Sequence, residues 1–168
     1  ISTGTEILVA HYAGAMKLDL AYKQLMRSVK LGVIFTVLLA VSVPLFSGKL
    51  FFSCFTDSKE VLAMATPIFL LTAVMEPGRV LNIIIINSLR AVGDTKFPVI
   101  MAVLSMWGIS ATLGSFLALY CGMGLLGVWI GFCADEWTRG IAMLIRWRTK
   151  AWVKAAKRNY RLNFRKSV

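Results

Sequence analysis

FPVIMAVLSMWGISATLGSFLALY, residues Phe97–Tyr120, is a stretch of 24 residues without a charged side chain. A helix of about 20 apolar residues crosses the hydrocarbon core of a bilayer. Because a helix satisfies its backbone hydrogen bonds internally, such a stretch is stable in lipid. The sequence therefore predicts a transmembrane helix at Phe97–Tyr120.

The composition of the whole chain is typical of a membrane protein. Hydrophobic residues make up 58% of the sequence, charged residues 16%, and the mean hydropathy is +0.72. A soluble domain has roughly 45–50% apolar and about 25% charged residues. The net charge of +11 would suit nucleic acid, but nine of the nineteen Lys and Arg residues lie between Arg146 and Lys166. We therefore expect lipid, and no nucleic acid, as a partner.

Working outward from Phe97–Tyr120, three more stretches are long and apolar enough to cross a bilayer. They are Leu31–Phe52, Val61–Leu89 and Met123–Trp147. Residues Ile1–Ala13 are interpreted as the end of an earlier span, and residues 148–168 as a basic tail. The predicted fold class is an all-α polytopic membrane protein with about four complete transmembrane helices plus the end of a fifth.

Short connections separate the predicted spans: Gly14–Lys30, Ser53–Glu60, Arg90–Lys96 and Cys121–Gly122. Lys and Arg residues gather on the side that holds the first loop, the third loop and the tail. The positive-inside rule places this side in the cytoplasm. We therefore expect a multi-pass protein of the plasma (inner) membrane, with Ser53–Glu60 outside and the C-terminus in the cytoplasm.

The tail alternates apolar and basic residues. Its apolar members are Trp152, Val153, Tyr160, Leu162 and Phe164. A helix of this composition lies on an anionic lipid surface. The main interpretation is an anchor that enforces topology, and binding of a partner protein or of lipid stays open beside it.

The predicted span Val61–Leu89 and its end carry one polar face. At 100° per residue, five positions fall within about 80° of each other: Glu76, Arg79, Ile83, Asn87 and Arg90. A charge at mid-span costs roughly 2.5–3.5 kcal/mol on insertion scales, so such residues usually face a cavity or a partner.

Glu76 is the candidate site for a coupling ion. Pro77 follows it and cannot donate a hydrogen bond to the carbonyl of Ala73, so a kink with a free carbonyl is expected beside the carboxylate. Transporters build ion sites from such broken helices. The alternative is an ion pair between Glu76 and Arg79 that only locks helices together.

The predicted span Met123–Trp147 carries a second charged group. Arg139 follows Asp135 by four residues and Glu136 by three, so it can reach both carboxylates. We favour an inter-helical gate or structural network here over a direct ion site. The span Phe97–Tyr120 is interpreted as scaffold.

Signals for enzyme chemistry are absent from the sequence. No metal-ligand spacing, nucleophile with a histidine partner, or phosphate-binding loop occurs, and the three cysteines have no redox or metal spacing. We expect a protein that is not an enzyme and has no cofactor. The coupling ion would be Na⁺ or H⁺, and no metal is expected beyond Na⁺ at Glu76.

The segment EPGRVLNIIIINSLRAVGDTKFP, residues 76–98, resembles the multidrug and toxic compound extrusion (MATE) family. Its most specific part is SLRAVGDTKFP, which is similar to the family's loop between the tenth and eleventh helices. Three more segments resemble the family in the correct order: GTEILVAHYAGA at Gly4–Ala15, GLLGVWIG at Gly124–Gly131 and DEWTRG at Asp135–Gly140.

The resemblance implies the C-terminal part of a twelve-helix transporter with two six-helix lobes. Residues 1–13 would end helix 8, residues 31–52 form helix 9, 61–89 helix 10, 97–120 helix 11 and 123–147 helix 12. Family members export cationic or amphipathic organic compounds by antiport with Na⁺ or H⁺. Glu76 is then the counterpart of an acid on the tenth helix, and the N-terminal lobe becomes a partner.

Two other functions stay open at this point. A lipid-linked saccharide flippase of the same superfamily is one, because the face from Arg79 to Arg90 could meet a phosphate. The other is a small basic membrane module that binds anionic lipid or a partner protein.

Overall fold

The structure of the chain, a computed structural model, describes the backbone of residues 1–53 and 59–166 and the side chains of residues 1–42 and 67–161. Over these residues it contains helices and turns and no strand. The α-helices are α1 (Ser2–Gly14), α2 (Leu18–Ser53), α3 (Lys59–Ala91), α4 (Lys96–Ser105), α5 (Thr112–Ser115), α6 (Leu125–Arg148) and α7 (Val153–Lys166). The π-helical segment η1 (Met106–Ala111) joins α4 to α5, and a second one, η2 (Phe116–Tyr120), continues α5, so that the four form one long rod. The predicted all-α fold class is confirmed.

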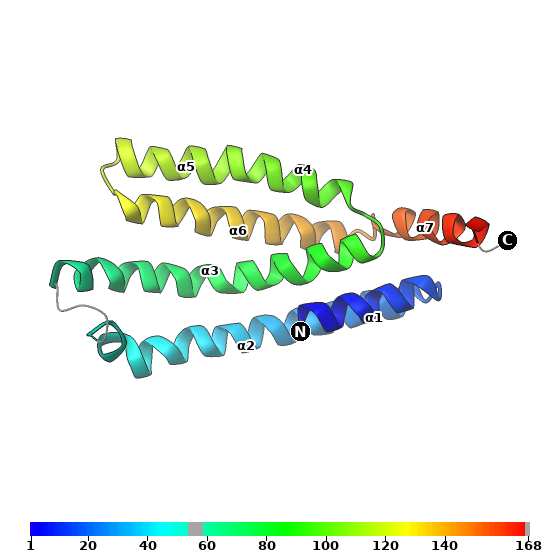
Figure 1. Cartoon of the computed structure of the whole chain (residues 1–168), viewed down its shortest axis with the longest axis horizontal. Helices are drawn as coiled ribbons and strands as arrows, with labels where there is room; N and C mark the ends of the chain where they lie inside the picture. Colours follow the sequence, from blue (N-terminus) through cyan, green and yellow to red (C-terminus); the bar gives the residue numbers. More distant parts are fainter. Residues whose placement is uncertain (54–58, 167–168) are drawn as a thin grey trace.

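The long helices lie side by side and run alternately up and down (Figure 1). α3 is central, since it packs against α2 on one side and against α6 on the other. The rod from α4 to η2 covers the far side of α6, and α1 lies against α2 and α3. α7 continues beyond the end of α6, at the end of the bundle that also holds the α1–α2 and α3–α4 turns.

Among the residues whose side chains the structure describes, three helical segments are long and apolar enough to cross a membrane: Leu18–Ser42, Pro67–Ala91 and Lys96–Tyr120. Their mean hydropathies are 1.8, 1.7 and 1.7. α6 has 24 residues and lies parallel to them, but Asp135, Glu136 and Arg139 interrupt its apolar sequence. The predicted outer loop Ser53–Glu60 includes residues 54–58, which lie outside the described residues.

The predicted loop Gly14–Lys30 is mostly helix, because α2 already begins at Leu18. Only a short turn separates α1 from α2, and Met16 adopts a positive φ of 57° in it. Ala21 and Leu25 are fully buried in the core with Val9 of α1. The basic residues of this segment suggested a loop, but its apolar side packs and therefore continues the helix.

α6 approaches the α5–η2 segment backbone to backbone. A Cβ atom added to Gly131 would lie 2.7 Å from the Cα of Gly114, and one added to Gly127 would lie 2.5 Å from the backbone nitrogen of Ala118. Small residues spaced four apart permit such close helix contacts in membranes. This contact places the middle of α6 beside the rod that covers it.

Two tryptophans close the core at the α7 end. The rings of Trp147 and Trp152 stack with centroids 4.2 Å apart and planes 7° apart, and both side chains are fully buried. Trp152 was expected on the apolar face of a tail lying on lipid. It is instead a core residue that fixes the start of α7 against the bundle, whereas the side chains of Leu162 and Phe164 lie outside the described residues.

Candidate functional site

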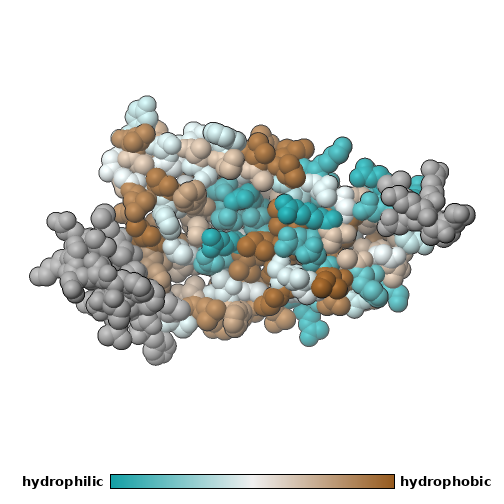
Figure 2. Space-filling view, viewed as in Figure 1, coloured by the Kyte–Doolittle hydropathy of each residue, from teal (hydrophilic) through white to brown (hydrophobic). Residues whose placement is uncertain are grey.

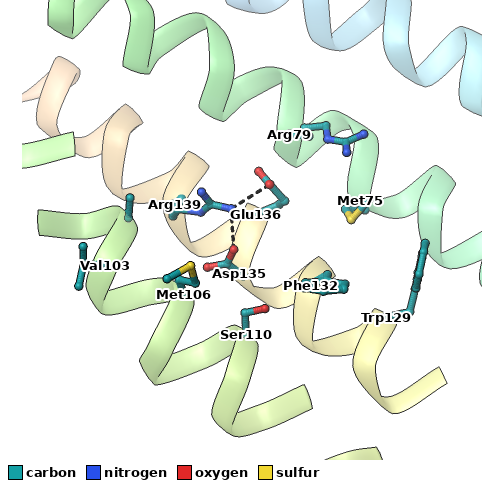
Figure 3. A pocket seen from close by; sticks show the side chains of 11 residues that line it. Met75, Arg79, Val103, Met106, Ser110, Trp129, Phe132, Asp135, Glu136 and Arg139 are labelled. Carbon is teal, nitrogen blue, oxygen red and sulfur yellow. Dashed lines mark hydrogen bonds and ion pairs between the residues drawn. The ribbon is translucent and has the colours of Figure 1, made fainter. Parts of the chain in front are cut away.

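A cavity of about 520 Å³ opens between α3, the α4–η1 rod and α6 (Figure 3). Ligand sites in proteins typically occupy roughly 300–1,000 Å³. Its lining combines charged, sulfur-containing and aromatic side chains: Met75, Arg79, Ala102, Val103, Met106, Ser110, Trp129, Phe132, Asp135, Glu136 and Arg139. Figure 2 shows hydrophilic residues gathered in the middle of one face, with hydrophobic residues along its edges.

Three charged residues of α6 form the polar wall of this cavity. One nitrogen of Arg139, Nη2, lies 2.6 Å from Oδ2 of Asp135 and 2.8 Å from Oε1 of Glu136. Asp135 is buried, whereas Glu136 and Arg139 are partly exposed to the cavity. The predicted contacts of Arg139 with both carboxylates are therefore present, because residues three and four apart share one helix face.

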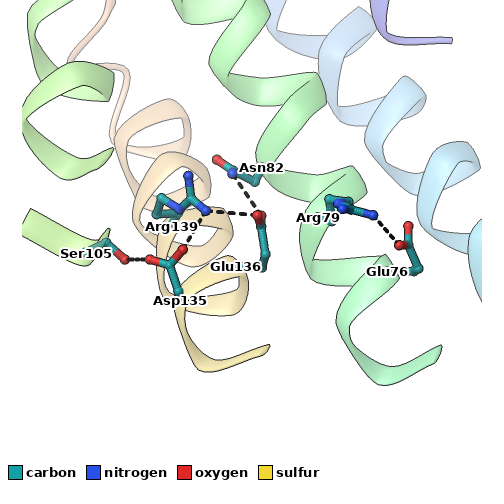
Figure 4. A network of polar contacts seen from close by, with 7 residues as sticks. All are labelled: Glu76, Arg79, Asn82, Ser105, Asp135, Glu136 and Arg139. Atoms are coloured by element: carbon teal, nitrogen blue, oxygen red, sulfur yellow. Dashed lines mark hydrogen bonds and ion pairs between the residues drawn. The ribbon is translucent and has the colours of Figure 1, made fainter. Parts of the chain in front are cut away.

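Neighbouring helices extend this charged group into a network (Figure 4). Ser105 of α4 donates a hydrogen bond from Oγ to Oδ1 of Asp135. Asn82 of α3 donates from Nδ2 to Oε2 of Glu136 at 3.1 Å. Each carboxylate is thus held by α6 and by one further helix, which fixes the three helices relative to one another.

The network carries one carboxylate more than guanidinium groups. Asp135 and Glu136 share the single cation Arg139, and within the described side chains no second cation pairs with either acid. Charged residues at membrane depth usually face a cavity or a partner, and these three line the cavity. The same described residues contain no group of three His, Cys, Asp or Glu side chains that could hold a metal ion.

The Glu76–Arg79 pair lies on the other side of α3. Nη1 of Arg79 is 2.5 Å from Oε1 of Glu76, and their side chains are 47% and 31% exposed. Arg79 lines the cavity, but Glu76 lines a separate apolar groove of about 350 Å³ between α2 and α3. The pair therefore links two spaces that α3 separates.

The expected break at Pro77 does not interrupt α3, which stays helical through both of its prolines. Ala73, whose carbonyl Pro77 leaves without its usual donor, lines the groove together with Glu76. At the residue after Ala73, Nε1 of Trp137 donates to the carbonyl of Val74 at 2.9 Å. Side chains of α6 therefore support α3 at the proline while the helix continues.

The rest of the predicted polar face does not reach the cavity. Asn87 donates from Nδ2 to the hydroxyl of Ser2 on α1 at 3.0 Å, and Arg90 is exposed at the end of α3. These two residues and Ile83 line neither the cavity nor the groove. Residues that share one face of α3 therefore lie in different surroundings in the fold.

Some cavity residues were missed by the sequence interpretation. The span Phe97–Tyr120 was interpreted as scaffold, yet Ser105 holds Asp135, and Met106 and Ser110 line the cavity. A serine in an uncharged span gives little signal by itself. Asn82 gave a clearer one, because an amide within a membrane helix usually has a polar partner.

An aromatic pair on α6, before the carboxylates in sequence, forms part of the cavity wall. The rings of Trp129 and Phe132 meet edge to face, with centroids 6.1 Å apart and planes 80° apart. Nε1 of Trp129 donates to Oγ1 of Thr72 on α3 at 2.8 Å, which fixes the indole. The aromatic rings and the carboxylates lie on the same helix, so the α6 wall of the cavity combines an apolar part with a charged part.

Comparison with known proteins identifies relatives of the chain. It is 45% identical over 154 residues to the "Uncharacterized transporter YisQ" of Bacillus subtilis, covering 92% of this chain and 34% of that protein. It is 29% identical over 123 residues to the "Probable multidrug resistance protein NorM" of Brucella suis, covering 70% of this chain and 26% of that protein. The protein of the same name in Deinococcus radiodurans is 28% identical over 159 residues, with 90% and 35% covered.

The chain spans between about a quarter and about a third of the length of these curated relatives. A search among solved structures found no match. The sequence model of the MatE family matches residues 1–116, which include α1 to α3 and most of the α4–η2 rod. The chain therefore belongs to the MatE family.

Proposed function

We propose that the protein is a secondary active efflux transporter. It exports cationic or amphipathic organic compounds in exchange for Na⁺ or H⁺, and this chain forms part of one six-helix lobe that works with an N-terminal lobe. The observation that carries the proposal is the cavity between α3, α4–η1 and α6, which aromatic and methionine side chains line together with a network that has a surplus carboxylate. The family match and the names of the NorM relatives support it.

In this proposal the cavity binds the organic substrate. The ring faces of Trp129 and Phe132 and the thioether of Met106 contact its apolar part. The surplus charge of Asp135 and Glu136 attracts its cationic part.

Glu76 supplies the proposed coupling. A Na⁺ or H⁺ that reaches Glu76 through the α2–α3 groove weakens the hold of this carboxylate on Arg79. The released guanidinium then adds a positive charge at the edge of the cavity that Arg79 already lines. A cationic substrate is repelled, which links ion entry on one side of α3 to substrate release on the other.

Replacing Glu76 with Gln tests the proposal in the full-length protein. Glu76→Gln removes the charge that holds Arg79 and cannot bind a coupling ion. We expect coupled efflux to fall by at least about tenfold, within the range of 5–150-fold that coupling energies of 1–3 kcal/mol produce. The measurement is retention of a fluorescent organic cation in cells, with the amount of protein in the membrane determined in parallel.

Glu6→Gln is the matched control, because Glu6 lies on α1 and lines neither the cavity nor the groove. It should export the dye as the unchanged protein does. If Glu76→Gln also exports the dye normally, Glu76 is not the coupling site. If the unchanged full-length protein exports no organic cation in a strain lacking other exporters, the efflux function itself is wrong.

A further inference from the structure

A second cavity, of about 810 Å³, lies at the end of the bundle where the α3–α4 turn meets α6 and α7. Among the described side chains, five cations and one carboxylate line it: Lys96, Arg146, Lys150, Lys154, Arg158 and Asp94. We call it the tail pocket. It is separate from the cavity of the proposed function, and its charge is of the opposite sign.

Two of the five cations already have a carboxylate partner. Arg146 forms a bidentate ion pair with buried Asp94, donating from Nε to Oδ2 at 2.9 Å and from Nη2 to Oδ1 at 3.3 Å. Its guanidinium also lies over the ring of Phe97, 4.8 Å from the centroid. Nζ of Lys150 is 3.3 Å from Oδ1 of exposed Asp19. These pairs orient the inner wall of the pocket.

The other three cations have no such partner. Among the residues that the structure describes, Lys96, Lys154 and Arg158 form no ion pair. They come from two different elements, the start of α4 and the first turns of α7, and face one cavity. Cations gathered in this way repel one another, and a phosphate placed between them relieves the repulsion.

Contacts within the chain hold the walls of the pocket in place. Trp152 stacks on Trp147 and donates from Nε1 to its carbonyl at 3.1 Å, which fixes the turn between α6 and α7. Nδ2 of Asn159 donates to the carbonyl of Val92 at 3.3 Å, which ties α7 to the α3–α4 turn. The arrangement is therefore part of the fold and not a property of a free tail.

The depth of the pocket indicates the source of the phosphate. Lys96 begins the apolar segment Lys96–Tyr120, whose length of about 37 Å exceeds the hydrocarbon core of about 30 Å. Its ends therefore lie among lipid headgroups. Phe97, the next residue, and Ile100, one turn further in, line the same pocket, and Ile100 is 56% exposed on the outside of the bundle. A molecule with a phosphate beside an acyl chain matches this sequence of charge and apolar surface.

We propose that the tail pocket binds the headgroup phosphate of an anionic phospholipid. The phosphate contacts Lys96, Lys154 and Arg158, and the acyl chains continue along α4 past Ile100. This differs from a tail that adheres to lipid by its overall charge. Overall charge makes every cation of α7 equivalent, whereas a pocket makes only those that line it important.

α7 itself provides the matched pair of variants. Lys154→Gln with Arg158→Gln removes two cations from the pocket. Lys157→Gln with Arg161→Gln removes two cations from exposed positions of the same helix that do not line it. Net charge and helix composition change equally in both variants. Size-exclusion chromatography and circular dichroism confirm that each is folded.

The experiment titrates full-length protein in a neutral detergent with short-chain phosphatidylglycerol and counts bound lipid by native mass spectrometry. Each Lys or Arg near an anionic lipid contributes about fivefold in affinity, so the pocket variant should bind about thirtyfold more weakly. The exposed variant should stay within about threefold of the unchanged protein. Lys96→Gln, on the opposite wall and outside the tail, should weaken binding by about fivefold.

Three results would overturn the proposal. Equal weakening by both α7 variants would mean that only overall charge matters. Equal binding of zwitterionic phosphatidylcholine with the same acyl chains would mean that the pocket does not select for the net negative charge of the lipid. Displacement of the lipid by inorganic phosphate or glycerol phosphate at similar concentration would assign the pocket to a soluble phosphate compound instead.

Discussion

At the scale of single residues, Arg139 holds the charged network together. It is the one cation that pairs with Asp135 and Glu136 among the described residues. Arg139→Gln leaves both carboxylates without a counter-charge in a partly buried site. Removing one partner of a buried ion pair destabilises a protein by about 3–5 kcal/mol. We expect a clearly lower thermal unfolding midpoint in detergent.

A triple variant separates charge from packing at the same place. Asp135→Asn, Glu136→Gln and Arg139→Gln together remove all three charges, and the two acids keep their shapes. Because this variant leaves no carboxylate without a counter-charge, it should unfold at a higher temperature than Arg139→Gln alone. A triple variant that is less stable than the single one would show that the charges do not govern stability here.

Local contacts in the site could be predicted from sequence, and distant ones could not. The pair Glu76–Arg79 and the contacts of Arg139 join residues three or four apart, which helical geometry brings together. The contact of Asn82 with Glu136 spans 54 residues and that of Ser105 with Asp135 spans 30. These depend on how the helices pack, which the periodicity of each helix does not contain.

At the scale of elements, the close contact between α6 and the α5–η2 segment requires glycine, which has no side chain, at the points of contact. Gly131→Ala would place a methyl group 2.7 Å from the Cα of Gly114, and backbone cannot move aside as a flexible side chain does. We expect a loss of about 1–3 kcal/mol, as for other overpacked contacts. The measurement is the free energy of unfolding in mixed detergent micelles.

Gly108→Ala is the matched control on the same rod. A Cβ added at Gly108 meets nothing within 4 Å, and alanine favours a helix over glycine by up to about 1 kcal/mol. This variant should therefore be as stable as the unchanged protein or slightly more stable. The two alanines thus have opposite expected signs, and equal effects would contradict the close contact.

The helices themselves were more predictable than their ends. The spans were identified because a long uninterrupted apolar sequence has few structural alternatives to a transmembrane helix. The start of α2 was placed too late because Lys23, Arg27 and Lys30 resemble a loop in composition. Their helix continues because its other side, with Ala21 and Leu25, is buried against neighbours that the sequence does not identify.

At the scale of the whole molecule, the two ends of the bundle differ in charge. The end with the α3–α4 turn and α7 carries the tail pocket, and the opposite end holds the uncharged turn between η2 and α6 (Figure 1). The asymmetry supports the proposed orientation in the plasma membrane, with α7 in the cytoplasm. Cys121 is exposed in the uncharged turn and can report its side directly.

The orientation is tested by labelling intact cells with a maleimide that does not cross membranes. In a full-length protein whose other cysteines are replaced by serine, Cys121 should be labelled from outside. With Cys121 also replaced and Lys157→Cys introduced on exposed α7, labelling should require permeabilised cells. Both cysteines are at water-exposed positions, so the difference reports the membrane and not burial. The reverse labelling pattern would place the tail pocket outside the cell. It would contradict the proposed topology, in which the positive-inside rule puts this basic end in the cytoplasm.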